Sequence, residues 1–346
     1  MTQRFAGPRV GNPNGPPTNG VARVTFRYSI CVLAAILTTA LLPASPAAAR
    51  SSIRVAVTDQ NPAMFDSPLF RSLRTKRTRY FVAANVMQDA GERERATAFV
   101  DAARRAGVSV LLHISTSDLR AKRGPVVSPG AYRRNAGRIV SHFRRLGVRE
   151  FGAWNEVNHR TQETWNRVGN AVSYFKSMYG AVRRRCRSCT VVGLDVLDQA
   201  GVSRYMRSFY ARLSRTWRKR LKVVGIHNYA DVNRNRSRGT RTIVNAARRY
   251  NRSTKFWFTE TGALASFRGS FPFSEARQAA RMRNMFTLAS RFKGRGVQRV
   301  YEYNFFGIET GGCGRSCLFD AGLVRPSGAA RPAYGVFASR LRSYSR

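Results

Sequence analysis

The feature that most constrains the fold of this chain is a regular alternation between short apolar runs and longer amphipathic ones. Eight short runs rich in Val, Ile, Phe or Tyr recur from residue 53 onward. Short continuous apolar runs are typical of parallel strands that are buried on both faces. The predicted strands cover residues 53–57, 80–84, 109–113, 150–154, 190–194, 223–227, 256–259 and 299–303.

Helical patterns fill most of the connections between these runs. The stretch 92–106, for example, repeats Ala96, Phe99, Val100 and Ala103 at the spacing of one helix face. Glycines follow several of these stretches, as they often follow the ends of helices. The predicted helices cover residues 92–106, 131–146, 165–184, 202–217, 242–250, 274–292 and 331–341.

Eight strand–helix units in one chain predict an α/β fold of the (β/α)8 TIM-barrel type. The main rival is a doubly wound open sheet, which usually carries a glycine-rich phosphate-binding turn after its first strand. Here that turn reads Thr58-Asp59-Gln60-Asn61-Pro62 and has no such glycines. We therefore expect a single barrel domain over residues 50–346.

Residues 1–49 have a different composition and predict an export segment. Four Arg precede an apolar run at 30–42, which is followed by Ala47-Ala48-Ala49. This order is typical of a secretory signal peptide, and the absence of paired Arg favours general secretion over the twin-arginine route. A retained N-terminal anchor is the alternative. No later segment is apolar enough to span a bilayer. We expect a secreted protein, extracellular or associated with the cell wall, with no transmembrane domain after processing.

The cysteines agree with export. Cys31 lies in the predicted signal, and four others remain in the rest of the chain. An even number of cysteines in a secreted chain favours disulfides. The simplest connectivity joins Cys186 to Cys189 and Cys313 to Cys317, although cross-pairing or a zinc site is also compatible with this spacing.

The formal charge of +43 predicts attraction to polyanions. The basic residues are scattered along the chain, which favours nonspecific adhesion to anionic cell-wall polymers over a dedicated recognition site. No nucleic-acid-binding motif is present, so a specific nucleic-acid partner is not expected.

Two short strings carry the candidate chemistry: Trp154-Asn155-Glu156 and Phe258-Thr259-Glu260. Each places a Glu at the end of a predicted strand, although the chain has only 18 acidic residues against 61 basic ones. Two carboxylates that face each other across a cleft are the basic requirement for hydrolysing a glycosidic bond. Glu156 and Glu260 are therefore the candidate catalytic residues.

Other polar and aromatic residues lie at the same ends of the predicted strands. Such a mixture suits a sugar, which has hydroxyl edges and apolar faces. Three further carboxylates, Asp195, Asp198 and Asp231, are predicted to cap loops or pair with Arg. The candidates for binding substrate or supporting the catalytic residues are Asn155, His227, Tyr229, His113, Trp154, Trp257, Glu302 and Tyr303.

These motifs, in this order, resemble the retaining glycoside hydrolases of clan A, which are (β/α)8 barrels with catalytic Glu residues on strands four and seven. The resemblance covers roughly residues 53–343. It implies that Glu156 is the acid/base, that Glu260 is the nucleophile and that His227 and Tyr229 support them. Two departures stand out. Many members carry a Trp at the eighth strand, whereas this chain reads Tyr301-Glu302-Tyr303-Asn304-Phe305 there. Arg79 lies at the wrong end of the second predicted strand for the Arg often found near it.

The resemblance implies a retaining β-glycosidase that acts on a polysaccharide or glycoconjugate. Tyr229, and also Asn155, could hold Glu260 charged, and the charge of Glu260 should raise the pKa of Glu156. No cofactor or metal is expected, because the four His lack metal-binding spacing. The sequence has no G-x-S-x-G motif, so a serine hydrolase with a nucleophile elbow is not predicted. We expect a monomer. The alternative is a cationic barrel that binds cell-wall polyanions with little or no hydrolysis.

Overall fold

The computed structural model describes residues 51–116, 127–267, 270–308 and 319–345. The predicted export segment and the pair Cys313 and Cys317 lie outside these ranges. The division into an export segment and a domain therefore stays a prediction, as does the second disulfide. Within the described ranges, no helix has the length and apolarity that a membrane span requires.

Nine strands form one parallel sheet in the order β11-β1-β9-β7-β6-β5-β4-β3-β2. Eight of them correspond to the eight predicted strands, so this expectation is confirmed. β4 is shorter than predicted, because the chain leaves the ladder after Gly152. The strands of the sheet are β1 Ser51–Thr58, β2 Arg77–Ala83, β3 Ser109–Ser115, β4 Glu150–Gly152, β5 Thr190–Leu197, β6 Val223–His227, β7 Lys255–Thr261, β9 Val297–Tyr303 and β11 Tyr344–Ser345.

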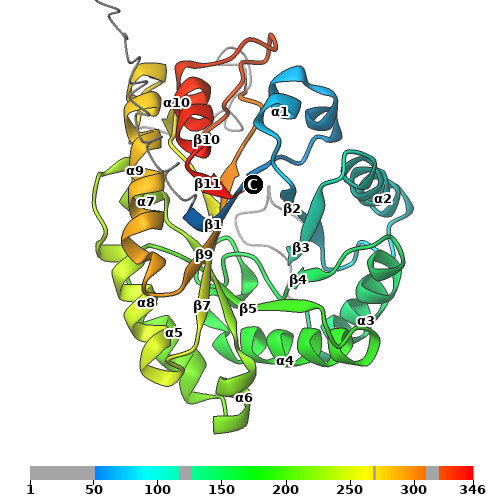
Figure 1. The fold of residues 1–346 in the computed structure, drawn as a ribbon. Helices are drawn as coiled ribbons and strands as arrows, with labels where there is room; N and C mark the ends of the chain where they lie inside the picture. Colours follow the sequence, from blue (N-terminus) through cyan, green and yellow to red (C-terminus); the bar gives the residue numbers. More distant parts are fainter. Residues whose placement is uncertain (1–50, 117–126, 268–269, 309–318, 346) are drawn as a thin grey trace, which may run out of the picture. The chain divides into compact units, whose positions relative to one another are not determined.

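The long helices lie around the outside of this curled sheet (Figure 1). Six of the predicted helices are present with shifted ends, and the predicted helix 202–217 is divided in two. The division falls where Ser214 caps a new helix by accepting from the amide of Trp217. The helices are α1 Pro68–Leu73, α2 Ala90–Arg105, α3 Pro129–Arg145, α4 Val168–Arg185, α5 Val202–Ala211, α6 Arg215–Arg220, α7 Tyr229–Asn233, α8 Arg238–Tyr250, α9 Glu275–Lys293 and α10 Pro332–Leu341, with 3-10 helices η1 Pro62–Asp66 and η2 Glu163–Asn166.

Two further short strands, β8 Ser266–Phe267 and β10 Phe319–Asp320, pair in an antiparallel ribbon outside the main sheet. Neither was predicted, because a two-residue strand leaves no periodic signal. Together they bring the segment after β7 beside the segment that precedes α10.

The hydrophobic core has two layers, as expected for a barrel. The larger layer lies between the sheet and its helices. The smaller layer lies inside the curled sheet, with members from β1, β3, β5, β6, β7 and β9. These inner residues are Ala56, Leu111, Val192, Val223, Trp257 and Tyr301.

β1 is joined by hydrogen-bonded ladders to β9 and β11, which both lie far along the chain. The Thr58 hydroxyl, for example, donates to the carbonyl of Glu302, 244 positions away. β1 also contacts β2, although no ladder is assigned between them in the described residues. The sheet therefore curls nearly into a ring whose closing strand comes from the beginning of the described chain.

A disulfide joins Cys186 and Cys189 directly after α4, with a Cα–Cα distance of 5.4 Å. The prediction of a local pair is confirmed at this position. Because both sulfurs are bonded to each other, this part of the structure does not fit the zinc alternative.

Candidate active site

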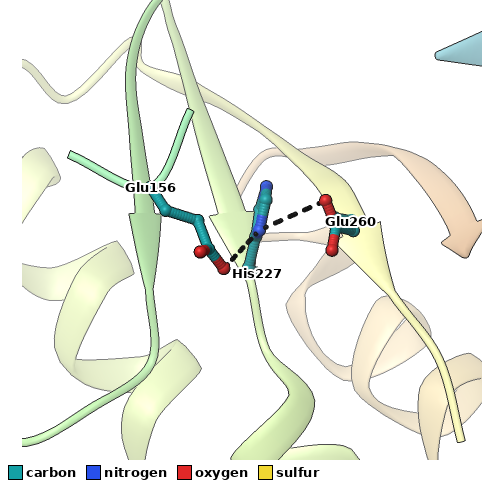
Figure 2. A group of neighbouring side chains, drawn as sticks. All are labelled: Glu156, His227 and Glu260. Carbon is teal, nitrogen blue, oxygen red and sulfur yellow. Dashed lines mark hydrogen bonds and ion pairs between the residues drawn. The ribbon is translucent and has the colours of Figure 1, made fainter. Parts of the chain in front are cut away.

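The carboxyl ends of β4 and β7 bring Glu156 and Glu260 to the same mouth of the sheet. His227 is the last residue of β6. One oxygen of Glu156, one oxygen of Glu260 and one ring nitrogen of His227 all lie within 4.8 Å of one another (Figure 2). The side chains of Glu156 and Glu260 keep 18% and 14% exposure, whereas that of His227 has none. The carboxylates thus face outward above a buried imidazole.

Glu156 is held in an unusual backbone conformation. Its φ of 44° lies in the left-handed region, which a residue with a long side chain rarely adopts. The neighbouring backbone compensates, because the amide of Asn155 donates to Ile114 and that of Val157 donates to Asp195. Strain that is fixed in this way is concentrated at functional sites, and here it aims the carboxylate into the mouth.

β7 contains one extra residue beside Glu260. From Gly225 to His227 β6 advances by two residues, while its partner β7 advances by three, from Trp257 to Glu260. Such an irregularity re-aims side chains in a strand. The consecutive residues Thr259 and Glu260 therefore both face the interior, which strict alternation would forbid.

Two side chains donate hydrogen bonds to the carboxylate of Glu260. Arg79 donates from Nη1 to Oε2 at 2.7 Å, and the Tyr229 hydroxyl donates to Oε1 at 3.0 Å. Burial and the charge of Glu260 raise the pKa of Tyr229 well above 10, so the phenol stays a neutral donor. Both contacts stabilise an ionised carboxylate.

The sequence placed Arg79 at the wrong end of its strand to reach the site, and this prediction is wrong. β2 begins at Arg77, and from there the long side chain of Arg79 reaches the mouth while remaining fully buried. Its guanidinium also donates from Nε to Nδ1 of His113 at 3.0 Å and from Nη2 to Oδ1 of Asn155. Asn155 is thus oriented by Arg79 and does not contact Glu260 through a hydrogen bond of its own in this structure.

His227 lies between Glu156 and a buried third carboxylate. Its Nδ1 is 3.0 Å from Oε1 of Glu156, and its Nε2 forms an ion pair with Oδ2 of Asp195 at 2.9 Å. Burial lowers the pKa of His227, but the charges of Asp195 and Glu260, the ion pair with Asp195 and the hydrogen bond to Glu156 outweigh burial and raise the pKa to about 10. His227 is therefore a cation at neutral pH.

The expected rise in the pKa of Glu156 is wrong for the protein without substrate. Burial raises this pKa, but the hydrogen bond and the charge of His227 outweigh burial, and the pKa falls below its ordinary value. The prediction rested on the negative charge of Glu260 and left out the positive charge of His227, which contacts both carboxylates. Glu156 and His227 are hydrogen-bonded at 3.0 Å, and the two groups titrate as a pair.

Two glycines make room for the buried groups. A Cβ on Gly152 would lie 1.9 Å from the ring of His113, and a Cβ on Gly225 would lie 1.8 Å from Oδ1 of Asp195. Glycine within a strand often marks such a close approach. Burial lowers the pKa of His113 to about 3, so this imidazole is neutral and supports Arg79 as an acceptor.

Asp198 and Asp231 behave as the predicted caps. Asp198 accepts from the amides of Ala230 and Asp231, at the start of α7. Asp231 accepts from the amide of Thr240, at the start of α8. Asp195 lies 4.0 Å from Arg79, as the prediction of an Arg partner requires. It also forms an ion pair with His227 and accepts a hydrogen bond from Thr259, which the prediction did not include.

Three predicted site residues lie outside this cluster. Trp154 is buried, and its ring nitrogen donates a hydrogen bond to Gln162. Trp257 belongs to the inner core, and the guanidinium of Arg299 lies 3.6 Å from the centre of the Trp257 ring. Glu302 is fully buried, and neither of its carboxylate oxygens has a hydrogen-bond partner in the described residues. Burial, with the charge of Asp59, raises the pKa of Glu302 well above its ordinary value, so it is a neutral acid of the core.

Tyr303 borders the mouth and belongs to an aromatic group that the motifs did not reveal in full. Its ring centre is 6.2 Å from that of Phe319, which in turn lies 5.1 Å from that of Tyr229. Phe319 comes from β10, in the segment that follows β9 in the sequence. No periodicity in the sequence could have identified it.

Glu156, His227 and Glu260 also have the composition of a metal site. Two features of the cluster favour proton chemistry instead. The Nδ1 atom of His227 is engaged with Glu156, and the Arg79 cation is bonded to Glu260. A cation would have to displace both contacts.

No protein-family model matches the sequence, and no curated protein matches it. Solved structures do match it. An exo-β-1,4-mannosidase from Opitutaceae bacterium strain TAV5 is 14% identical, with a TM-score of 0.65 over 85% of this chain and 60% of that one. A GH5_18 protein from Streptomyces cattleya, solved with GlcNAc, is 14% identical, with a TM-score of 0.61 over 86% and 83%.

A GH39 enzyme from Xanthomonas axonopodis pv. citri is similar at 14% identity, with a TM-score of 0.60 over 84% of this chain and 66% of that one. The chain has the barrel fold of these glycosidases. The (β/α)8 architecture that the resemblance implied is therefore confirmed. The chain spans 60% of the length of the mannosidase, and identities this low establish the fold alone.

Proposed function

We propose that this chain is a retaining glycoside hydrolase that cleaves β-linked sugars in a polysaccharide or glycoconjugate. The observation that carries the proposal is the separation of Glu156 and Glu260, whose nearest oxygens lie within 4.8 Å. Retaining enzymes hold their carboxyl groups about 5–5.5 Å apart, whereas inverting enzymes leave about 6.5–9.5 Å for a water molecule. The fold shared with known glycosidases supports the same proposal.

Glu260 acts as the nucleophile. Arg79 and Tyr229 keep its carboxylate charged and oriented. One oxygen of Glu260 bonds to the anomeric carbon while the bond from that carbon to the leaving oxygen breaks. Glu156 gives its proton to the leaving oxygen, so the first product departs as a neutral alcohol.

His227 supplies the proton that Glu156 needs. In the resting protein that proton is on Nδ1 of His227, 3.0 Å from Oε1 of Glu156. Its transfer leaves a neutral imidazole and a protonated carboxyl, without a proton taken from solvent. Asp195 stabilises the resting cation from the other side of the ring.

The second step returns every group to its starting state. Glu156, now a carboxylate, takes a proton from water while the water oxygen bonds to the anomeric carbon. Glu260 leaves as a carboxylate, and the sugar keeps its original configuration. The proton on Glu156 then returns to His227. We further propose export of the chain, on the basis of its first 49 residues, and a role for Asn155 in binding a sugar hydroxyl.

The test combines two variants with a panel of aryl β-glycosides and polysaccharides, with product anomers followed by NMR. Glu260→Ala should reduce kcat on the order of 10⁴-fold or more, and azide should restore turnover to a product of inverted configuration. Glu156→Ala should lose about 10²–10⁴-fold on poor leaving groups and far less on good ones.

Glu302→Gln is the matched control, since it removes a carboxyl that lies outside the cluster. Full activity of Glu260→Ala would overturn the proposal. The alternative of a cationic binding barrel with little hydrolysis is not favoured, because the two carboxylates and their supporting groups are all in place.

A further inference from the structure

Two helices that pack against each other, α3 and α4, contain no acidic residue. On α3, Arg134, Arg138, His142 and Arg145 recur at spacings of four, four and three positions. Side chains at this spacing lie along one face of a helix. The four positions therefore form a basic stripe about 16 Å long, at 1.5 Å per residue.

This stripe forms one side of a surface groove with a volume of about 820 Å³. The end of α4 contributes Arg184 and Arg185, and Arg185 donates from Nε to the Ser141 hydroxyl of α3. Met87, in the loop after β2, lines the groove as well. We call this feature the arginine groove; its six Arg are Arg133, Arg134, Arg138, Arg145, Arg184 and Arg185.

The arginine groove lacks counter-ions of its own. None of its six Arg takes part in the ion pairs found among the described residues, and all six are exposed. The acid whose charge acts on His142 is Asp101 of α2, which is itself paired with Arg104 at 3.3 Å. Like charges four positions apart on a helix repel each other and destabilise the helix. A bound anion would relieve this repulsion.

We propose that the arginine groove binds a strand of an anionic polysaccharide. Guanidinium groups match the planar carboxylates of such a strand with two parallel hydrogen bonds. Grooves for single-stranded nucleic acid combine basic residues with aromatic platforms, whereas the described residues that line this groove include no Phe, Tyr or Trp. Scattered charge along the sequence had argued against a dedicated site, but folding gathers these Arg on two neighbouring helices.

The groove extends from the end of the barrel that carries the catalytic mouth. Met87 follows β2, and Gln88 beside it donates to Asn135 near the start of α3 at 3.3 Å. A strand in the groove would therefore run along the outer wall, from Met87 toward the last turns of α3 and α4. The proposal goes beyond the proposed hydrolysis and concerns a second site, because binding here requires neither carboxylate.

The test measures binding of the full chain to sodium alginate, with dextran as the neutral polymer and an oligothymidylate as the nucleic acid. The groove variant Arg134→Ser/Arg138→Ser/Arg145→Ser is compared with Arg204→Ser/Arg207→Ser/Arg212→Ser, on α5 and at its C-cap. Both remove three exposed positive charges. The groove variant should bind alginate at least about tenfold more weakly, with a salt slope reduced by about two to three. The control should change less than about twofold.

Equal losses in the two variants would overturn the proposal, because net charge alone would then explain binding. Tighter binding of oligothymidylate than of alginate, lost only in the groove variant, would overturn it in favour of a nucleic acid. Unchanged cleavage of a neutral aryl glycoside and an unchanged circular dichroism spectrum show that each variant is folded. The variant Glu156→Gln/Glu260→Gln should bind alginate as the parent does, so a failure of the hydrolytic proposal is distinguishable from a failure of this one.

Discussion

His227 connects the two exposed carboxylates to the charges buried beneath them. Two cations, Arg79 and His227, lie among three carboxylates, and only Glu156 and Glu260 are open to solvent. Transfer of a proton from His227 to Glu156 removes one positive and one negative charge, so the net charge of the cluster does not change. The cluster is therefore arranged so that one proton can move between Glu156 and His227 at small electrostatic cost.

We predict that Asp195→Asn moves the basic limb of the pH profile of kcat/KM downward by about one pH unit or more. Asp195 favours the cationic form of His227, whose pKa is about 10. Without that charge the Glu156–His227 pair loses its proton at lower pH. Asp231→Asn, at a helix cap, is the control. An unchanged basic limb in Asp195→Asn would contradict the proton-sharing role of His227.

Sequence motifs predicted Glu156, Glu260, His227 and Tyr229 because each is at the end of an apolar run. Arg79 was missed because it lies three residues into β2, and only the length of its side chain brings it to the mouth. The pairing of Asp195 with His227 could not be read from the sequence, since an Asp after a strand is most often a loop cap. Three residues were predicted as site residues because they lie close in sequence to the ends of strands, but their side chains point into the core. They are Trp154, Trp257 and Glu302.

Among the elements, β6 and β7 decide the geometry of the mouth. The extra residue in β7 turns Glu260 inward, and the missing side chain at Gly225 of β6 leaves space for Asp195. Eight strands could be predicted because buried parallel strands are continuous apolar runs. The extra residue could not, because it changes register without changing composition. The short strands β8, β10 and β11 left no pattern to detect.

We predict that Gly225→Ala destabilises the protein by about 1–3 kcal/mol, the usual cost of overpacking, and reduces kcat more than it changes KM. The added methyl group would lie 1.8 Å from Asp195 and must displace it from His227. Gly169→Ala on α4 meets nothing within 4 Å and should be neutral or stabilising by about 0.5 kcal/mol. Thermal unfolding and steady-state kinetics of both variants provide the measurement. Equal stability of the two would show that Asp195 does not need this space.

At the scale of the whole molecule, the charge imbalance works against the fold. The chain has 61 basic residues and 18 acidic ones, and many of the acids are buried in the site or in caps. Unscreened positive charges repel one another and weaken the compact state. The sequence predicted a general affinity for polyanions from this imbalance, but the concentration of Arg on α3 and α4 emerged only from the folded chain.

We predict that Tm rises by several degrees when NaCl is increased from about 10 mM to about 100 mM, which shortens the Debye length from about 30 Å to about 10 Å. Screening weakens the repulsion between exposed Arg while leaving buried pairs such as Arg79–Glu260 nearly unchanged. Differential scanning calorimetry is the measurement, with sucrose as an uncharged control for general solute effects. A Tm that falls with salt would mean that surface ion pairs outweigh the repulsion.

The pairing of β1 also has a consequence for how the protein is made. Its ladders join it to β9 and β11, and the Ser345 hydroxyl donates to the carbonyl of Ser51 across 294 positions of sequence. At about 5–20 residues per second, a ribosome needs on the order of tens of seconds to translate from one partner to the other. Until β9 is synthesised, β1 has no strand with which to form a ladder, so the nascent chain cannot complete its sheet and stays accessible to a chaperone.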